Sequence, residues 1–232
     1  MKRNKPFIML GIALFMGLFP ACDMLEDVYD GTADGGTDTK EETLREGQYY
    51  IDATNYAQWV YINLHTPTPV ITTATISLDD LTETGTPEQW DIAQHRYDVK
   101  TNGATVLMTP YHSIAELEAA GLPQDGQWVE DEESETSITV DMSHMMEGFL
   151  TYAPGHKNKE IGKWVDVDTS TMPPNYTMHD NVMILHLSDG TYAALQLANF
   201  MSTDRYQTKG WMTVNYKYPI FAKNEGNEKK EK

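Results

Sequence analysis

Alternation of apolar and polar side chains is the feature that most constrains how this 232-residue chain can fold. Residues 211–218 place Trp211, Thr213, Asn215 and Lys217 alternately with Met212, Val214, Tyr216 and Tyr218. Successive side chains of a strand point to opposite faces, so a period of two predicts a β-strand. Further strands are expected at residues 72–78, 104–108, 136–140 and 163–167.

One turn and one helix are also predicted by their local residues. Residues 181–187 and 191–197 flank Ser188, Asp189 and Gly190. An Asp-Gly pair supplies the positive φ of a tight turn, so these segments predict a hairpin. A helix is expected over residues 113–120, with Ser113 and Glu116 at capping-box spacing and Gly121 as its stop. The sequence therefore predicts a mainly β protein, a single all-β domain of antiparallel strands with one or two short helices.

The first residues have the pattern of an export signal. Lys2, Arg3 and Lys5 precede an apolar run over residues 7–19, which is too short to span a bilayer. Cys22 is the single cysteine, and Leu18-Phe19-Pro20-Ala21 before it resembles a lipobox. These features predict a lipoprotein signal peptide over residues 1–21 and a lipid on Cys22, with a buried or free thiol as the alternative.

Composition divides the rest of the chain into three parts. Residues 22–48 are rich in Gly, Thr, Asp and Glu, which predicts a flexible acidic tether. Residues 49–222 have scattered aromatic residues and enough length for one core, whereas residues 223–232 form a charged tail. Acidic residues just after Cys22 resemble the tract that sends lipoproteins to the cell surface. We therefore expect a lipid anchor in the outer membrane with surface exposure, or a form later shed as soluble protein.

Charge and motifs narrow the function. The net charge of −18 falls to about −21 without residues 1–21, because these contain three basic residues and no acidic ones. Such a charge repels phosphate backbones and disfavours nucleic-acid binding. The sequence contains no His-Glu-x-x-His, no Gly-x-Ser-x-Gly and no phosphate-binding glycine loop. A binding protein is therefore expected rather than an enzyme.

Methionine is unusually concentrated in one part of the chain. Five of the 13 methionines lie between residues 142 and 178, namely Met142, Met145, Met146, Met172 and Met178. Methionine usually fills gaps in a core, but Met145 and Met146 follow a predicted strand end and Met172 lies in the loop-like segment 168–175. Thioether sulfur is a soft, neutral ligand for haem iron or copper(I). These three residues are therefore candidate metal ligands.

Three segments, residues 50–59, 90–102 and 210–219, resemble the HmuY family of haem-capturing lipoproteins of Bacteroidetes. The most specific is Trp-Asp-Ile-Ala-Gln-His-Arg-Tyr-Asp-Val at residues 90–99. The resemblance implies a nearly all-β fold with haem b, iron protoporphyrin IX, in a cleft between two strand-bearing loops. It also implies a noncatalytic carrier that takes haem from host haem proteins and passes it to an outer-membrane haem transporter. A glycan- or peptide-binding surface lipoprotein is the alternative.

The resemblance does not carry over the family's two iron-binding histidines. The second histidine position falls on Thr169, three residues before Met172, and the first falls within residues 141–146. Some relatives use methionine, which implies Met145, or Met146 in its place, paired with Met172. His144 paired with Met172 is the alternative, and in an extended chain His144 would share a face with Met146.

Other residues are expected around the haem. Tyr176 and Phe149, with Tyr152 and Met178, are candidates for the walls beside the porphyrin. Lys157, Lys159 and Lys163 are candidates for pairing with the propionates, with an ordinary solvated lysine run as the alternative. His95, inside the resembling motif, is expected to be structural. The remaining histidines, expected at the surface or in the core, are His65, His112, His156, His179 and His186.

Overall fold

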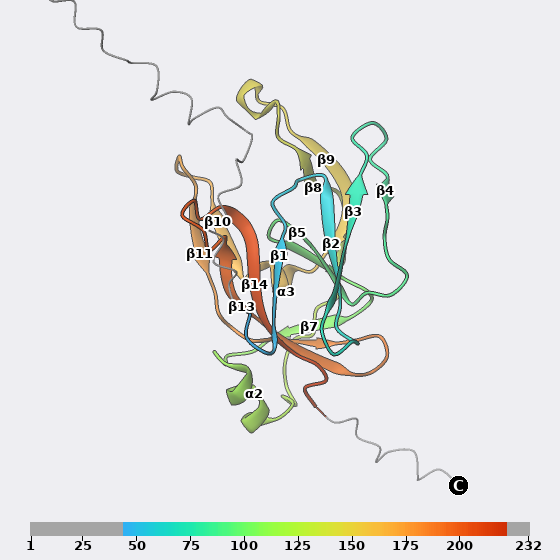
Figure 1. Cartoon of the computed structure of the whole chain (residues 1–232), viewed down its shortest axis with the longest axis vertical. Coiled ribbons are helices and arrows are strands. Elements are labelled where there is room, and N and C mark those ends of the chain that lie inside the picture. The colour runs from blue at the N-terminus through green and yellow to red at the C-terminus, as the bar shows by residue number, and fades with distance from the viewer. Residues whose placement is uncertain (1–43, 222–232) are drawn as a thin grey trace, which may run out of the picture. The chain divides into compact units, whose positions relative to one another are not determined.

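The computed structural model describes residues 44–221, except for the side chains of residues 134–137. The predicted signal peptide, Cys22, most of the tether and the charged tail lie outside the described residues. Two five-stranded antiparallel sheets form the body of the domain (Figure 1). The first contains, in spatial order, β1 (Gln48–Asp52), β14 (Lys209–Lys217), β13 (Tyr192–Met201), β12 (Met183–His186) and β7 (Thr105–Met108). The second contains β4 (Glu83–Thr84), β3 (Val70–Ile76), β2 (Gln58–Asn63), β5 (Ile92–His95) and β6 (Asp98–Thr101).

The main core lies between these two sheets. Ile62 of β2 and Ile92 of β5 belong to the same buried cluster as Leu195 of β13 and Val214 of β14. Their alternation along each strand places every second side chain in this cluster, as a period of two requires. The predicted mainly β fold of antiparallel strands is therefore confirmed.

The outer faces of both sheets are covered as well. Trp59 and Tyr61 of β2 form a second cluster with Ile138 and Ala153 of a long hairpin, β8 (Glu132–Asp141) and β9 (Thr151–Lys157). On the other sheet, Ile184 and Leu117 belong to a third cluster, to which the helix α2 (Ile114–Ala120) contributes. Strand β2 is consequently buried on both of its faces.

Most of the predicted elements are present with shifted ends. The Ser113 hydroxyl accepts a hydrogen bond from the Glu116 N–H at 3.2 Å, and Gly121 ends α2 with a φ of 80°. Gly190 has a φ of 81° in the predicted turn between β12 and β13. The expected strand at 163–167 begins only at Val165, because Lys163 caps a short helix that the sequence did not predict. In the part of the chain that the structure describes, no helix is long and apolar enough to cross a membrane.

This unpredicted helix, α3 (Lys159–Gly162), joins the long hairpin to a shorter one, β10 (Val165–Asp168) and β11 (Asn175–Met178). Asn158 is 1% exposed and caps α3, because its side-chain oxygen accepts hydrogen bonds from Glu160 N–H at 3.0 Å and Ile161 N–H at 3.3 Å. Its amide nitrogen donates to the Val129 carbonyl at 3.0 Å and to Asp131 at 3.1 Å. Asn158 thus fixes the junction between the two hairpins.

Replacing Asn158 by alanine should therefore destabilise the whole domain. The variant loses the cap of α3 and the two hydrogen bonds that the buried amide donates to Val129 and Asp131, which together cost about 2–4 kcal/mol. Urea unfolding of Asn158→Ala and wild type measures this difference. Asn55→Ala is the matched control, since Asn55 is exposed and its side chain accepts only from Ala57 N–H at 2.9 Å. Equal losses in the two variants would contradict the role given to Asn158.

Candidate functional site

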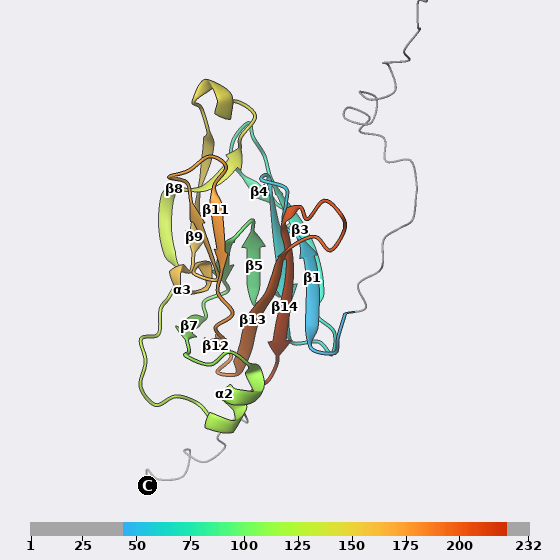
Figure 2. The ribbon, with the colours of Figure 1, turned by 90° about the vertical axis from the view of Figure 1, so that its left-hand side faces the viewer.

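The two hairpins point toward the same end of the domain, away from α2 (Figures 1 and 2). The tip of β8–β9 comprises residues 142–150 and contains the 3₁₀ turn η1 (Met145–Glu147). The tip of β10–β11 comprises residues 169–174 and contains Met172. We call these segments the first and second methionine tips. The structure thus brings the candidate ligands to one end of the molecule from two different hairpins.

Large apolar side chains are exposed mainly on these hairpins. Of the 13 exposed large apolar side chains in the described residues, eight belong to the two hairpins: Met145, Met146, Phe149, Leu150, Tyr152, Val167, Met172 and Met178. An apolar group left in water costs free energy that burial against a ligand would recover, at about 1.5–3 kcal/mol for a whole large side chain. A concentration of this kind on one part of a domain is typical of a binding surface.

The β10–β11 hairpin has one apolar and one polar face. Its register pairs Val165 with Met178 and Val167 with Tyr176. Since residues paired across an antiparallel ladder share a face, these four line one face. The other face carries Asp166, Asp168, Asn175 and Thr177. Val165 is buried at the root, whereas Val167 and Met178 are exposed, so part of the apolar face is uncovered.

At the first methionine tip the chain is turned rather than extended. Residues 145–147 form one 3₁₀ turn, closed by a hydrogen bond from Gly148 N–H to the Met145 carbonyl at 3.0 Å. With three residues per turn, His144, Met145 and Met146 project in three directions, so the extended-chain geometry that would pair His144 with Met146 does not apply. Met146 is 91% exposed and Met145 is 45% exposed.

His144 faces a carboxylate within the same tip. Its Nδ1 lies 3.1 Å from the Glu147 carboxylate, as expected for residues three apart in a 3₁₀ turn. At the base of the tip, Ser143 donates its N–H to Asp141 at 2.8 Å, and hydrogen bonds from Ser143 lower the pKa of the Asp141 carboxyl group. The tip is therefore held by its own hydrogen bonds.

The second methionine tip is organised in a similar way. Ser170 donates its N–H to Asp168 at 2.9 Å, and the hydroxyl of Thr171 donates to the Pro173 carbonyl at 3.1 Å. Hydrogen bonds from Ser170 lower the pKa of the Asp168 carboxyl group. Met172 at the centre of this tip is 84% exposed. Its thioether is consequently available to a ligand.

The two residues expected as porphyrin walls differ in their surroundings. Phe149 is exposed in the first methionine tip, with little protein around its ring. Tyr176 is instead partly buried, and its ring packs on Phe200 at 6.1 Å and on Tyr97 at 5.8 Å between ring centroids. Tyr176 therefore connects the second hairpin to the core and presents only part of its ring to the apolar face.

The lysines considered for propionate binding lie at the hairpin roots. Lys157 contacts Asp98 at 3.3 Å, Lys159 pairs with Glu132, and Lys163 pairs with Glu160 at 2.5 Å. Each of these ammonium groups already has a carboxylate partner. Since α3 begins at Lys159, all three lie where the hairpins start rather than at the methionine tips.

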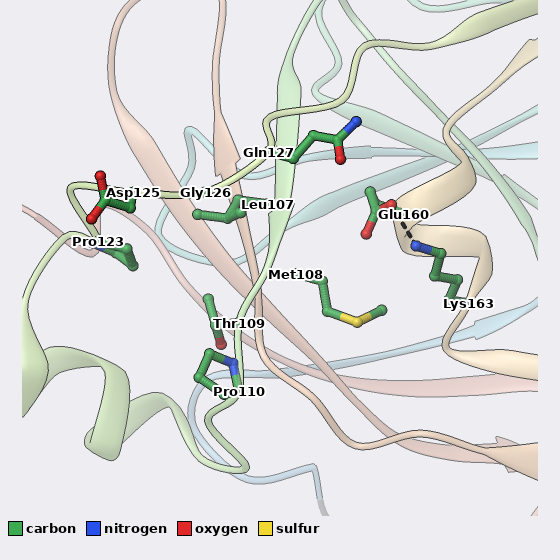
Figure 3. Close-up of a pocket in the computed structure, with 10 residues that line it drawn as sticks. All are labelled: Leu107, Met108, Thr109, Pro110, Pro123, Asp125, Gly126, Gln127, Glu160 and Lys163. Carbon is green, nitrogen blue, oxygen red and sulfur yellow. Dashed lines mark hydrogen bonds and ion pairs between the residues drawn. The ribbon is translucent and has the colours of Figure 1, made fainter.

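The described hollows lie elsewhere on the domain. A cavity of about 320 Å³ lies beside α3, with Leu107 and Gly126 next to each other in its lining and Glu160 and Lys163 on the α3 side (Figure 3). A groove of about 720 Å³ runs along α2 and the end of β14, and a third hollow of about 540 Å³ adjoins Trp90. None of these three is lined by a residue of the methionine tips, so the candidate site rests on exposed tips.

The other histidines have structural surroundings. His95 is buried, with its Nε2 2.7 Å from the Tyr56 carbonyl, and burial lowers its pKa. Burial alone would also lower the pKa of His65, but hydrogen bonds and charge from Asp91 and Asp189 raise it overall. Within residues 44–221, no group of three or more His, Cys, Asp or Glu side chains is arranged to hold a metal ion.

Comparison with known proteins identifies relatives of this fold. No curated protein matches the chain. A protein described as a lipoprotein of Bacteroides fragilis shares 44% identity over 75% of this chain and 90% of its own, with a TM-score of 0.68. A protein of Bacteroides vulgatus described as an HmuY-like haem-binding protein shares 40% identity over 75% of this chain and 92% of its own, with a TM-score of 0.66.

A more distant likeness extends to the apo form of an HmuY analogue of Tannerella forsythia. It shares 22% identity over 75% of this chain and 97% of its own, with a TM-score of 0.57, and so shows the common fold alone. The sequence model described as HmuY protein matches residues 55–216, which include both hairpins and most of the two sheets. On this match and these identities, the chain belongs to the HmuY family.

Proposed function

We propose that this protein binds haem between its two methionine tips, with Met172 on one side of the iron and Met145 or Met146 on the other. The observation that carries the proposal is the exposure of thioether groups on two hairpins that point the same way. Membership of the HmuY family, and the haem-binding description of the relative from Bacteroides vulgatus, support haem as the ligand.

The residues of this end of the domain suit the chemistry of haem. The porphyrin is a large apolar disc, and the exposed Phe149, Leu150 and Val167 offer apolar contacts for it. Iron at its centre accepts soft thioether ligands above and below the plane. Because the tips are exposed, an open site on the surface would receive the ligand without a buried channel.

Three residues of the first methionine tip compete for the iron. Met146 is the more exposed of the two methionines, whereas about half of the Met145 side chain is covered. His144 has its Nδ1 beside Glu147, and iron-binding imidazoles commonly have a carboxylate partner of this kind. We favour Met145 or Met146, because the second tip offers methionine and no histidine. Variants of all three residues decide between them.

Replacing Met172 by leucine should weaken haem binding at least tenfold, since leucine keeps the apolar volume but removes the sulfur ligand. Met145→Leu and Met146→Leu should differ from each other, because the turn directs the two side chains differently. Haemin titration followed by Soret absorbance measures each affinity. Met178→Leu is the matched control, being an exposed methionine of the same hairpin as Met172.

A Met172→Leu protein that titrates like wild type would remove Met172 from the site. A wild-type protein that produces no Soret shift would reject haem binding altogether. The latter result would favour a surface lipoprotein that binds glycan or peptide.

The redox state of the iron should affect binding in a direction set by the ligand. Thioether sulfur carries no proton in the physiological range, whereas imidazole, with an ordinary pKa of about 6.5, becomes protonated as the pH falls. A soft neutral donor also favours the reduced metal. We expect tighter binding of ferrous than ferric haem, and a ferrous affinity nearly independent of pH between about 5.5 and 7.5.

Titrations with ferrous and ferric haem at both pH values, on wild type and His144→Ala, measure this behaviour. Ferric binding that is stronger, collapses in acid and disappears in His144→Ala would assign the iron to histidine instead.

We also propose that Cys22 carries a lipid that anchors the protein to the outer membrane, where it takes haem from host haem proteins for delivery to an outer-membrane haem transporter. The description of the Bacteroides fragilis relative as a lipoprotein supports the anchor. The Cys22→Ala protein should be absent from the membrane fraction. It should still bind haemin as wild type does, because the anchor and the site are separate parts of the chain. Fractionation followed by immunoblotting tests this, and full membrane retention of Cys22→Ala would defeat the assignment.

A further inference from the structure

Lys209 differs from every other lysine of the described residues in its partner. Five described lysines contact a carboxylate, namely Lys100, Lys157, Lys159, Lys163 and Lys217. No carboxylate among the side chains that the structure describes lies within ion-pairing distance of Lys209, and its ammonium nitrogen lies instead 4.9 Å from the centre of the Tyr176 ring.

The Lys209 ammonium group lies over the ring of a residue of the second hairpin. Tyr176 lies in β11 on the apolar face that ends in the second methionine tip. Tyr97 and Phe200 pack against its ring and hold it in place. Lys209 begins β14, and Figure 2 shows the β13–β14 connection in the half of the domain that carries the hairpin tips. A cation thus lies over an aromatic ring of the hairpin that carries the second methionine tip.

Other nearby cations are already engaged with the protein. Arg96 lies 5.6 Å from the Tyr97 ring, but its Nη1 donates a hydrogen bond to the Thr54 carbonyl at 2.9 Å. The lysines at the hairpin roots, first considered for propionates, pair with carboxylates of their own. Lys209 is exposed, so its ammonium group can accept an anionic partner in addition to the ring.

Haem presents such an anion. Its two propionates are negatively charged at neutral pH, and the acidic protein as a whole repels them. A single cation at short range offsets this repulsion locally, since charge interactions weaken with distance and with salt. We propose that Lys209 is the anion-binding residue of that site and pairs with a haem propionate, an inference that rests on the proposed haem function.

The test compares two porphyrins on three proteins. Haemin and haemin dimethyl ester, whose propionates are neutral esters, are titrated into wild type, Lys209→Gln and Lys217→Gln. Lys209→Gln should bind haemin roughly three- to tenfold more weakly, the range between an exposed ion pair and a charge-assisted hydrogen bond. Its affinity for the ester should match that of wild type. The difference for haemin should shrink in high salt, while the Soret position stays unchanged because the iron ligands are intact.

The control variant and the outcomes that would contradict the inference can be told apart. Lys217→Gln removes an exposed lysine that pairs with Glu118, and should bind both porphyrins as wild type does. An equal loss for haemin and ester in Lys209→Gln would show that Lys209 only supports Tyr176, and would overturn the inference. Unchanged haemin binding in Lys209→Gln would also overturn it while leaving the haem function standing. Failure of wild type to bind either porphyrin would instead reject the haem function, and the inference with it.

Discussion

The hydrogen bonds of the buried Asn158 side chain are the constraint on which the arrangement of the candidate site depends. This side chain joins the start of α3 to the backbone at Val129 and to Asp131, while Ile161 and Trp164 pack into the main core on either side. Trp164 also donates its ring N–H to the Tyr97 carbonyl at 3.1 Å. Strand β9 of the first hairpin ends just before α3, and strand β10 of the second hairpin begins just after it. The roots of both hairpins are therefore anchored in the core. This anchoring orients both tips toward the same end of the domain.

Much of the fold could be predicted from local sequence because its signals are local. Alternation along residues 211–218 and the Asp189-Gly190 turn each specify structure through neighbouring residues, and both are present. Helix α3 gave no such signal, since four residues are too short to show a helical period and its stability comes from Asn158 and the core. Family membership supports the expectation of a binding protein rather than an enzyme.

The candidate site could be predicted only in part from the sequence. The exposure of Met146 and Met172 follows from their positions in loops, which sequence can indicate. The 3₁₀ turn that separates the directions of His144, Met145 and Met146 depends on hydrogen bonds within the tip, so the condition of an extended chain, under which His144 would share a face with Met146, is not met there. Lys209 and Tyr176 are far apart in sequence and meet only because β11 packs against β13, whose Met201 pairs with Lys209. No spacing rule relates such a pair.

Exposed sulfur and apolar surface would normally invite self-association, and the charge of the chain bears on how this protein tolerates them. A net charge of −18 makes two copies repel each other over most of their surfaces, which opposes contact between apolar tips. The same charge would also repel an anionic porphyrin. An open apolar site on an acidic protein therefore needs a local cation to admit a ligand with carboxylates while the surrounding charge keeps other copies away. Under the proposal, Lys209 would be that cation, since it is the lysine of the described residues that has no carboxylate partner.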